Sequence, residues 1–198
     1  MGTLSRVGLA DLVRTYGLDT LVETGTGHGH SVIAALQVPE LLDIRSIELD
    51  RETWHRNVVV FATEKRVRLY HGDSPRLLPT LCRELYAQRV LWWLDAHFPG
   101  SGRLDPVPML PDHGSVPLVH EVAALLEHRR EWLEHDVIVV DDLCLFEPGA
   151  YEHDAAHLRA GLAWKDAPTH WLDQELARSH VIERLTIDGG YLIARPRL

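Results

Sequence analysis

The chain has 198 residues, of which 45% are apolar, so it is long enough to bury the core of one globular domain over residues 1–198. Acidic residues outnumber basic ones by 29 to 20, and the formal charge of −9 argues against a nucleic-acid partner. No apolar run is long enough to predict a membrane span, and neither Cys82 nor Cys144 has CxxC spacing. We therefore expect a cytoplasmic protein with no disulfide framework and no membrane partner.

Apolar runs alternate with helical periodicities along the chain, which is typical of a mostly parallel sheet covered on both faces. A first helix is predicted from Ser5 to Tyr16, ending at Gly17. The strands that follow are expected near residues 20–24, 43–48, 66–70, 89–95 and 136–141. The helices that alternate with them are expected near residues 30–37, 51–63, 75–87 and 117–133.

The pattern changes after Asp142, where a polar stretch rich in histidine runs to Ser179. Two apolar segments, 180–187 and 191–195, then flank the glycines of an Asp-Gly-Gly turn, which predicts an antiparallel hairpin. The predicted fold class is therefore α/β, with a doubly wound, mostly parallel seven-stranded sheet that finishes in this C-terminal hairpin.

A glycine-rich turn between the first strand and its helix is the most informative segment. Its alternating glycines are Gly25, Gly27 and Gly29. Glycine lets the backbone approach a ligand closely, so the turn is predicted to bind a nucleotide. His30 stands where the dinucleotide fingerprint requires a third glycine, and the Glu23 carboxylate would repel a pyrophosphate while suiting the cationic S-adenosylmethionine. A tight turn that binds nothing is the alternative.

Acidic residues also follow the next two predicted strands. Glu48, 23 residues after the first glycine of the turn, is expected to accept hydrogen bonds from ribose hydroxyls. Asp50 is expected instead to cap the helix that begins next to it. Asp73 and Ser74 follow the third strand and are candidates to read an adenine edge, although Asp-Ser-Pro is also an ordinary helix start.

Three aspartates follow the fourth and fifth strands. Asp95 ends one apolar run, and Asp141 and Asp142 end the other, so neighbouring strands would bring them to the rim that carries the glycine turn. Gathered carboxylates repel one another unless they are protonated or bridged, and oxygen ligands suit Mg²⁺ or another hard divalent ion. Capping of the following segments is their alternative role. His97 is a candidate general base, with a metal-neighbouring or loop-bonding role as alternatives.

Six motifs of the chain occur in the order found in class I S-adenosylmethionine-dependent methyltransferases. They are Glu23–Ser31, Ser46–Glu48, His71–Ser74, Trp93–Phe98, Pro117–Glu121 and Val139–Asp142. The chain thus resembles this family over most of its length, and its E-T-G-T, W-L-D-x-H and D-D motifs are similar to those of a group of small bacterial methyltransferases. The resemblance implies a Rossmann-like domain that binds S-adenosylmethionine. The expected cofactor contacts are Glu23, Gly25, Gly27, Gly29, Ser31, Glu48, Asp73, Ser74 and Asp95.

The aspartates are also similar to those of metal-dependent O-methyltransferases of the macrocin and catechol types. The resemblance implies that Asp95, Asp141 and Asp142 hold Mg²⁺, which binds substrate hydroxyls. His97 and Asp95 are the candidate catalytic residues. The lysine that follows the strand-four acid in catechol-type enzymes is absent, since His97 and its neighbours stand there. The short amino terminus leaves substrate cover to the 97–116 loop, a predicted lid, or to the partner subunit of a homodimer.

The expected function is therefore metal-assisted O-methylation of a hydroxyl on a small molecule or sugar. A metal-independent N- or O-methyltransferase needs the same cofactor site but only a base. A non-catalytic nucleotide-binding protein and an NAD-dependent oxidoreductase are the remaining alternatives.

Overall fold

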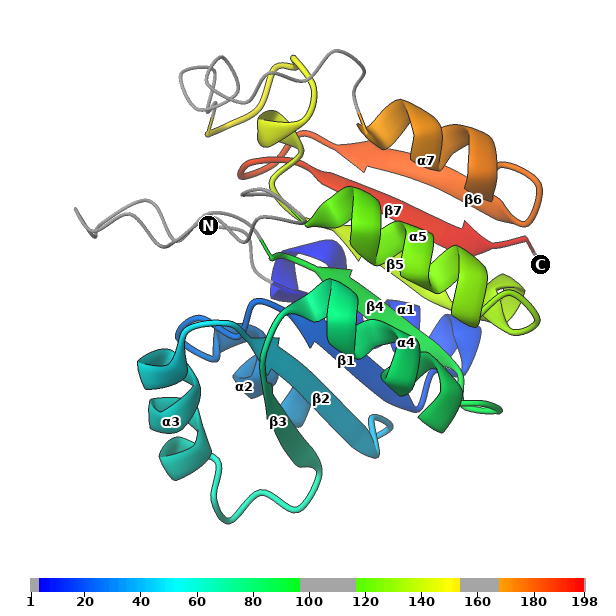
Figure 1. The fold of residues 1–198 in the computed structure, drawn as a ribbon. Helices are drawn as coiled ribbons and strands as arrows, with labels where there is room; N and C mark the ends of the chain where they lie inside the picture. The colour runs from blue at the N-terminus through cyan, green and yellow to red at the C-terminus, as the bar shows by residue number, and fades with distance from the viewer. Residues whose placement is uncertain (1–3, 97–116, 154–167, 198) are drawn as a thin grey trace.

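The computed structural model describes residues 4–96, 117–153 and 168–197, which form an α/β unit around one seven-stranded sheet (Figure 1). The strands are β1 (Thr20–Thr24), β2 (Asp43–Glu48), β3 (Val67–His71), β4 (Val90–Leu94), β5 (Val137–Val140), β6 (His180–Leu185) and β7 (Tyr191–Pro196). The α-helices are α1 (Leu9–Tyr16), α2 (His30–Leu36), α3 (Arg51–Val60), α4 (Ser74–Glu84), α5 (Leu118–His128) and α7 (Pro168–Leu176). Short 3₁₀ helices are η1 (Leu4–Val7), η2 (Leu133–His135) and η3 (Leu143–Leu145).

The strand order is β3-β2-β1-β4-β5-β7-β6, with five parallel strands and the antiparallel pair β6–β7 at one edge. This confirms the predicted doubly wound sheet and its C-terminal hairpin. The five parallel strands also match their predicted bounds to within one residue at each end. The match is close for β4 and β5 because both are buried along their whole length, and a fully buried strand reads as a continuous apolar run.

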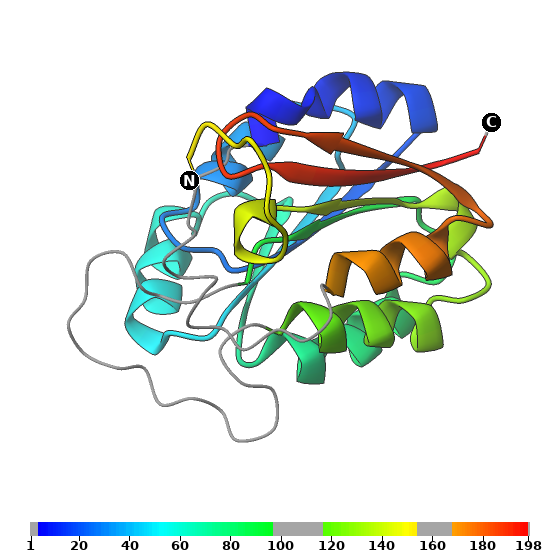
Figure 2. The same ribbon diagram turned by 90° about the horizontal axis from the view of Figure 1, so that it is seen from above.

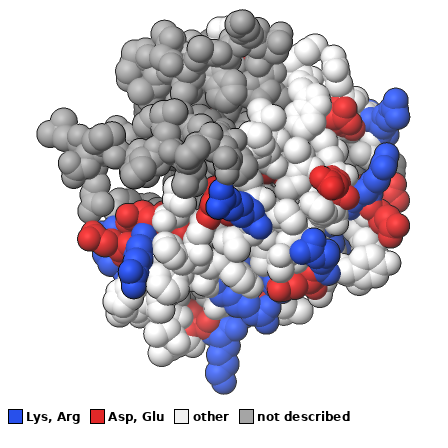
Figure 3. All heavy atoms as spheres, viewed as in Figure 1, with Lys and Arg blue, Asp and Glu red and all other residues white. Residues whose placement is uncertain are grey.

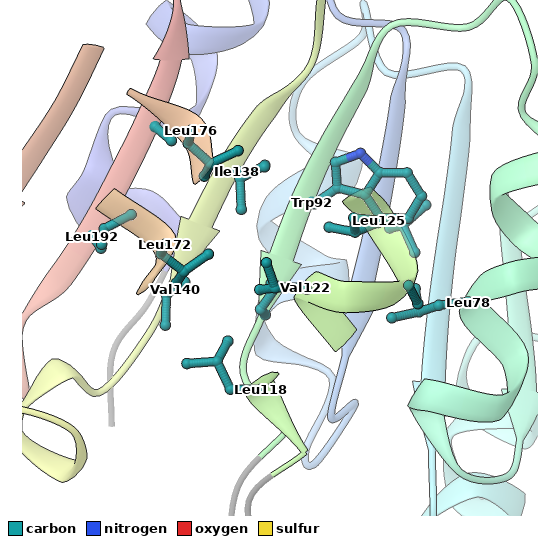
Figure 4. Packing of buried hydrophobic residues seen from close by; sticks show 14 of the residues in the cluster. Leu78, Trp92, Leu118, Val122, Leu125, Ile138, Val140, Leu172, Leu176 and Leu192 are labelled. Atoms are coloured by element: carbon teal, nitrogen blue, oxygen red, sulfur yellow. The ribbon is translucent and has the colours of Figure 1, made fainter. Parts of the chain in front are cut away.

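Helices cover both faces of the sheet. Figure 2 shows α1 on one side and α4, α5 and α7 on the other. The side chains that alternate along each strand divide accordingly: Trp93 and Val139 pack toward α1 and α2, while Trp92 and Ile138 pack toward α4, α5 and α7. In Figure 4, Leu118, Val122 and Leu125 of α5 lie in the second of these cores together with Trp92.

Several helix bounds differ from prediction. Gly8, with a φ of 71°, divides the expected first helix into η1 and α1. Helix α5 ends at His128, because the buried Arg129 turns inward to donate to Asp136 Oδ2 at 2.7 Å. Helix α7 was not predicted, since few of its side chains are buried and the surrounding sequence is polar. Within the described residues, no helix has the length and apolar character needed to cross a membrane.

The parallel topology fixes where functional side chains can gather. Strand β1 lies between β2 and β4, and β5 adjoins β4, so the carboxyl ends of these strands share one rim. Loops that leave this rim carry the glycine turn, Glu48 and the three aspartates. In open α/β sheets this is the edge at which ligands bind.

Candidate cofactor-binding and active site

The first glycine of the turn is required by backbone packing between strands. Gly25 has a φ of +86°, a conformation that other residues adopt only with strain. A Cβ added to Gly25 would lie 2.9 Å from the carbonyl oxygen of Asp95, and the Gly25 amide donates to Ile47 O at 2.9 Å. The end of β1 thus lies in close contact with the ends of β4 and β2. The residues that follow these three strands are therefore brought close together.

The second glycine forms the open part of the turn. Gly27 is exposed, has a φ of +52°, and a Cβ added to it would meet no atom within 4 Å. Its amide donates to Glu48 Oε2 at 2.9 Å, and its carbonyl oxygen accepts a hydrogen bond from Asn57 Nδ2 at 2.9 Å. An open backbone beside an acid is the arrangement expected of a nucleotide-binding turn.

Glu23 lies beneath the turn and not on its surface. Its side chain is fully buried, and its oxygens accept hydrogen bonds from the hydroxyls of Ser46, at 2.5 Å, and Ser31. Burial raises the pKa of Glu23 well above its usual range; the Ser46 hydrogen bond opposes this, while Asp95 and Glu48 add to it. The structure therefore shows Glu23 and Ser31 as an internal support of the turn, and their contact with a cofactor stays a prediction.

Glu48 links the glycine turn to the loops that follow β2 and β3. Besides Gly27, it accepts the Asp50 amide at 2.8 Å, and its own carbonyl oxygen accepts the Gly72 amide at 2.9 Å. Burial raises the pKa of Glu48, and the hydrogen bonds from the Asp50 and Gly27 amides counteract that effect. Asp50 caps α3 by accepting the Thr53 amide at 2.8 Å, which confirms its predicted capping role, while the ribose contact of Glu48 stays a prediction.

Asp73 and Ser74, predicted together, face different surroundings. Asp73 is the N-cap residue of α4 and lies 3.4 Å from Arg76, near the Gly72 amide that binds Glu48 O. Ser74 is buried, and its hydroxyl donates to Glu121 on α5. Asp73 therefore lies at the rim, whereas the Ser74 hydroxyl points into the contact between α4 and α5, away from the expected adenine.

Glu121 is a fully buried acid that sequence reasoning did not assign to the site. Burial raises its pKa to about 7; the hydroxyls of Ser74 and Thr24 act in the opposite direction, and the nearby Asp73 and Asp95 raise it further. It thus lies among the residues that end β1, β3 and β4. At neutral pH its protonated and charged forms are both populated.

The three aspartates do not form the predicted metal cluster. The Asp141 amide donates to Leu94 O at 3.1 Å, so pairing of β4 with β5 continues to Asp95 and Asp141, which end neighbouring strands. Asp142 has a φ of 52°, and its Oδ1 occupies the space that a Cβ on Gly189 would need. Within the described part of the chain, no group of three histidine, cysteine or acidic side chains is arranged to hold a metal ion. Asp142 is turned toward the β6–β7 hairpin, which leaves Asp95 and Asp141 at the adjacent strand ends.

Two further predictions lie outside the described residues. These are His97 as the general base and the 97–116 loop as a lid.

Two supporting residues had weak sequence signals. Asn57 lies on α3 and binds both Gly27 O and Thr53 O at 2.9 Å, but a single asparagine in a helix predicts no contact with a distant turn. Glu121 interrupts the apolar face that Leu118 and Leu125 share on α5. An acidic residue within the apolar face of a helix is the one sequence pattern that could have indicated a role for Glu121.

Comparison with known proteins identifies the fold. No protein-family model matches the chain, and no curated protein sequence matches it significantly. A candidate caffeoyl-CoA O-methyltransferase from Staphylococcus aureus is 14% identical with a TM-score of 0.64, covering 100% of this chain and 85% of that chain. Methyltransferase PaMTH1 from Podospora anserina, solved with S-adenosylhomocysteine, is 16% identical with a TM-score of 0.62, covering 98% and 79%. Cofactor-bound Rv0187 from MTB is 18% identical with a TM-score of 0.59, covering 100% and 81%.

These similarities show that the chain has the Rossmann-like fold of class I methyltransferases. At such low identities they establish the fold and leave the activity to the site itself.

The raised pKa of Glu121 predicts a pH dependence of stability. Because its pKa is about 7 in the folded chain and near 4.5 when unfolded, its stabilising effect is complete below pH 4.5 and is lost as the pH rises to 7. Between these values the free energy of unfolding of the wild type should fall by about 3 kcal/mol relative to Glu121→Gln.

Urea unfolding at several pH values measures this difference. Glu127→Gln, whose side chain is 75% exposed on the same helix, should follow the wild-type curve. If the free energies of unfolding of the wild type and Glu121→Gln changed in parallel with pH, the raised pKa assigned to Glu121 would be contradicted.

Proposed function

We propose that the chain is an S-adenosylmethionine-dependent methyltransferase. The observation that carries this proposal is the open Gly27 backbone, which lies beside Glu48 at the carboxyl end of β2. The class I methyltransferase fold supports it, since the glycine turn and the acid lie at the rim where such folds bind ligands. The cofactor-bound states named for PaMTH1 and Rv0187 are consistent with the proposal.

The proposed roles follow from the positions of the side chains. Glu48 would accept hydrogen bonds from the ribose hydroxyls, Gly27 would let the backbone approach the ligand, and Asp73 would face the adenine. When bound, S-adenosylmethionine supplies an electrophilic methyl group; the acceptor oxygen forms the new C–O bond as the C–S bond breaks, and its proton passes to a base. The chain contributes by orienting the two reactants on a rigid rim. His97 stays the candidate base.

We propose a small molecule or sugar hydroxyl as the acceptor. The formal charge of −9 disfavours a polyanionic substrate such as a nucleic acid. On the face shown in Figure 3, basic and acidic side chains are intermingled over the described surface instead of gathering by sign. A neutral acceptor agrees with this distribution.

Removal of the Glu48 carboxylate should weaken cofactor binding. In isothermal titration with S-adenosylhomocysteine, Glu48→Ala should raise Kd roughly tenfold to a hundredfold, the effect of losing hydrogen bonds to a charged group. Glu64→Ala, which changes an exposed acid beyond α3, is the control and should keep wild-type affinity.

Titration of the wild type with NAD separates the two cofactor classes. The methyltransferase proposal requires S-adenosylhomocysteine to bind and NAD not to bind. Unchanged affinity in Glu48→Ala would remove the ribose assignment, and preferential binding of NAD would favour an oxidoreductase.

We further propose that Mg²⁺ or another hard divalent ion assists the reaction, held by Asp95 and Asp141. Support comes from the continued β4–β5 pairing, which sets these residues at adjacent strand ends, and from the burial of Asp141. Mg²⁺ sites in enzymes commonly use one or two carboxylates together with water and substrate oxygens. The ion would stabilise negative charge on the acceptor oxygen. Asp142 is left out because its carboxyl group packs against Gly189.

Matched aspartate variants test this pair. In titrations of the S-adenosylhomocysteine complex with Mg²⁺, Asp141→Asn should lose at least tenfold in affinity because one charged ligand is neutralised. Asp142→Asn and the exposed control Asp11→Asn should bind as the wild type does.

Equal losses in Asp141→Asn and Asp142→Asn would restore the three-aspartate site. Absence of Mg²⁺ binding by the wild type would favour a metal-independent methyltransferase.

A further inference from the structure

A buried carboxyl group on α5 lies where an apolar side chain would be expected. Glu121 has no exposed surface, and its neighbours along the helix face, Leu118, Val122 and Leu125, are buried in the core beneath α4 and α7. Figure 4 shows Leu125 beside Trp92, with Val122 and Leu118 farther along the same helix. The helix is therefore held rigidly, and so is the Cα atom of Glu121.

The groups around Glu121 come from separate strand ends. The Ser74 hydroxyl, at the start of α4, donates to Glu121 Oε1. The Thr24 hydroxyl, at the end of β1, also faces the carboxyl group. Thr24 Oγ1 in turn accepts the amides of Asp95 at 3.2 Å and Ala96 at 3.3 Å. The Glu121 side chain thus links the loops that follow β1, β3 and β4.

Stability alone gives no reason for an acid in this position. Burial disfavours the charged form of Glu121, and the nearby carboxylates of Asp73 and Asp95 disfavour it further. An apolar side chain of similar volume would fill the same space without that cost. The carboxyl group instead fixes the orientation of the Ser74 hydroxyl, and through it the position of the first turn of α4.

We propose that Glu121 is a positioning residue for cofactor binding, which holds the β3–α4 turn through Ser74 so that Asp73 stays at the rim beside Glu48. This inference rests on the proposed function, since Asp73 and Glu48 are the groups proposed to bind adenosine. Glu121 itself is enclosed by protein and acts through Ser74. Its loss should therefore lower affinity for the cofactor without removing any ligand contact directly.

Four variants separate positioning from general support of the fold. Glu121→Leu removes the hydrogen bond but fills the apolar space, so thermal unfolding should show a folded chain, while Kd for S-adenosylhomocysteine should rise roughly tenfold. Glu121→Gln keeps an oxygen acceptor for Ser74 and should restore affinity to within about threefold of the wild type. Ser74→Ala should match Glu121→Leu, and the double variant should lose no more than either single one.

Glu127→Gln, an exposed change on α5, is the matched control and should bind as the wild type does. Wild-type affinity in a folded Glu121→Leu would overturn the inference, as would additive losses in the double variant. Should Glu121→Leu fail to fold, Ser74→Ala decides alone: reduced affinity supports the inference and unchanged affinity overturns it. A wild-type chain that binds no S-adenosylhomocysteine would instead overturn the proposed function, and the inference with it.

Discussion

The site depends on a backbone-to-backbone contact between the ends of β1 and β4. Gly25 touches the Asp95 carbonyl group so closely that no side chain fits between them, and the same residue donates to Ile47 O at the end of β2. Three strand ends are thereby fixed relative to one another before any side chain is considered. The positions of the open Gly27 backbone, Glu48 and Asp95 follow from this arrangement, since Asp95 is part of the contact and the other two are one or two residues from it.

Buried carboxyl groups support the rim from below. Glu23 is held by the hydroxyls of Ser31 and Ser46, and Glu121 by that of Ser74, so both acids act inside the protein. Their raised pKa values follow from burial, which favours the neutral form. A neutral acid both donates and accepts hydrogen bonds, which suits a group that must fix several loops at once. The exposed Gly27 backbone and the partly buried Glu48 and Asp73 lie at the rim that these acids support.

The sequence predicted best those features that depend only on residues close together in the chain. The buried parallel strands, the cap at Asp50 and the position of Glu48 could all be predicted, because periodicity, capping and strand-end placement are local rules. The roles of Asn57 and Glu121 depend on contacts between distant segments, which spacing does not encode. The predicted grouping of three aspartates is not seen in the described residues for a related reason: Asp142 was placed by strand order, but its positive φ and the hairpin at Gly189 turn it away.

We expect an adenosine ligand to lie over Gly27, between Glu48 and Asp73. A crystal structure of the chain with S-adenosylhomocysteine should show ligand density above the glycine turn, with both ribose hydroxyls within hydrogen-bond distance of the Glu48 carboxylate. Density at another edge of the sheet, or side chains filling the space above Gly27 in a crystal saturated with the ligand, would contradict it.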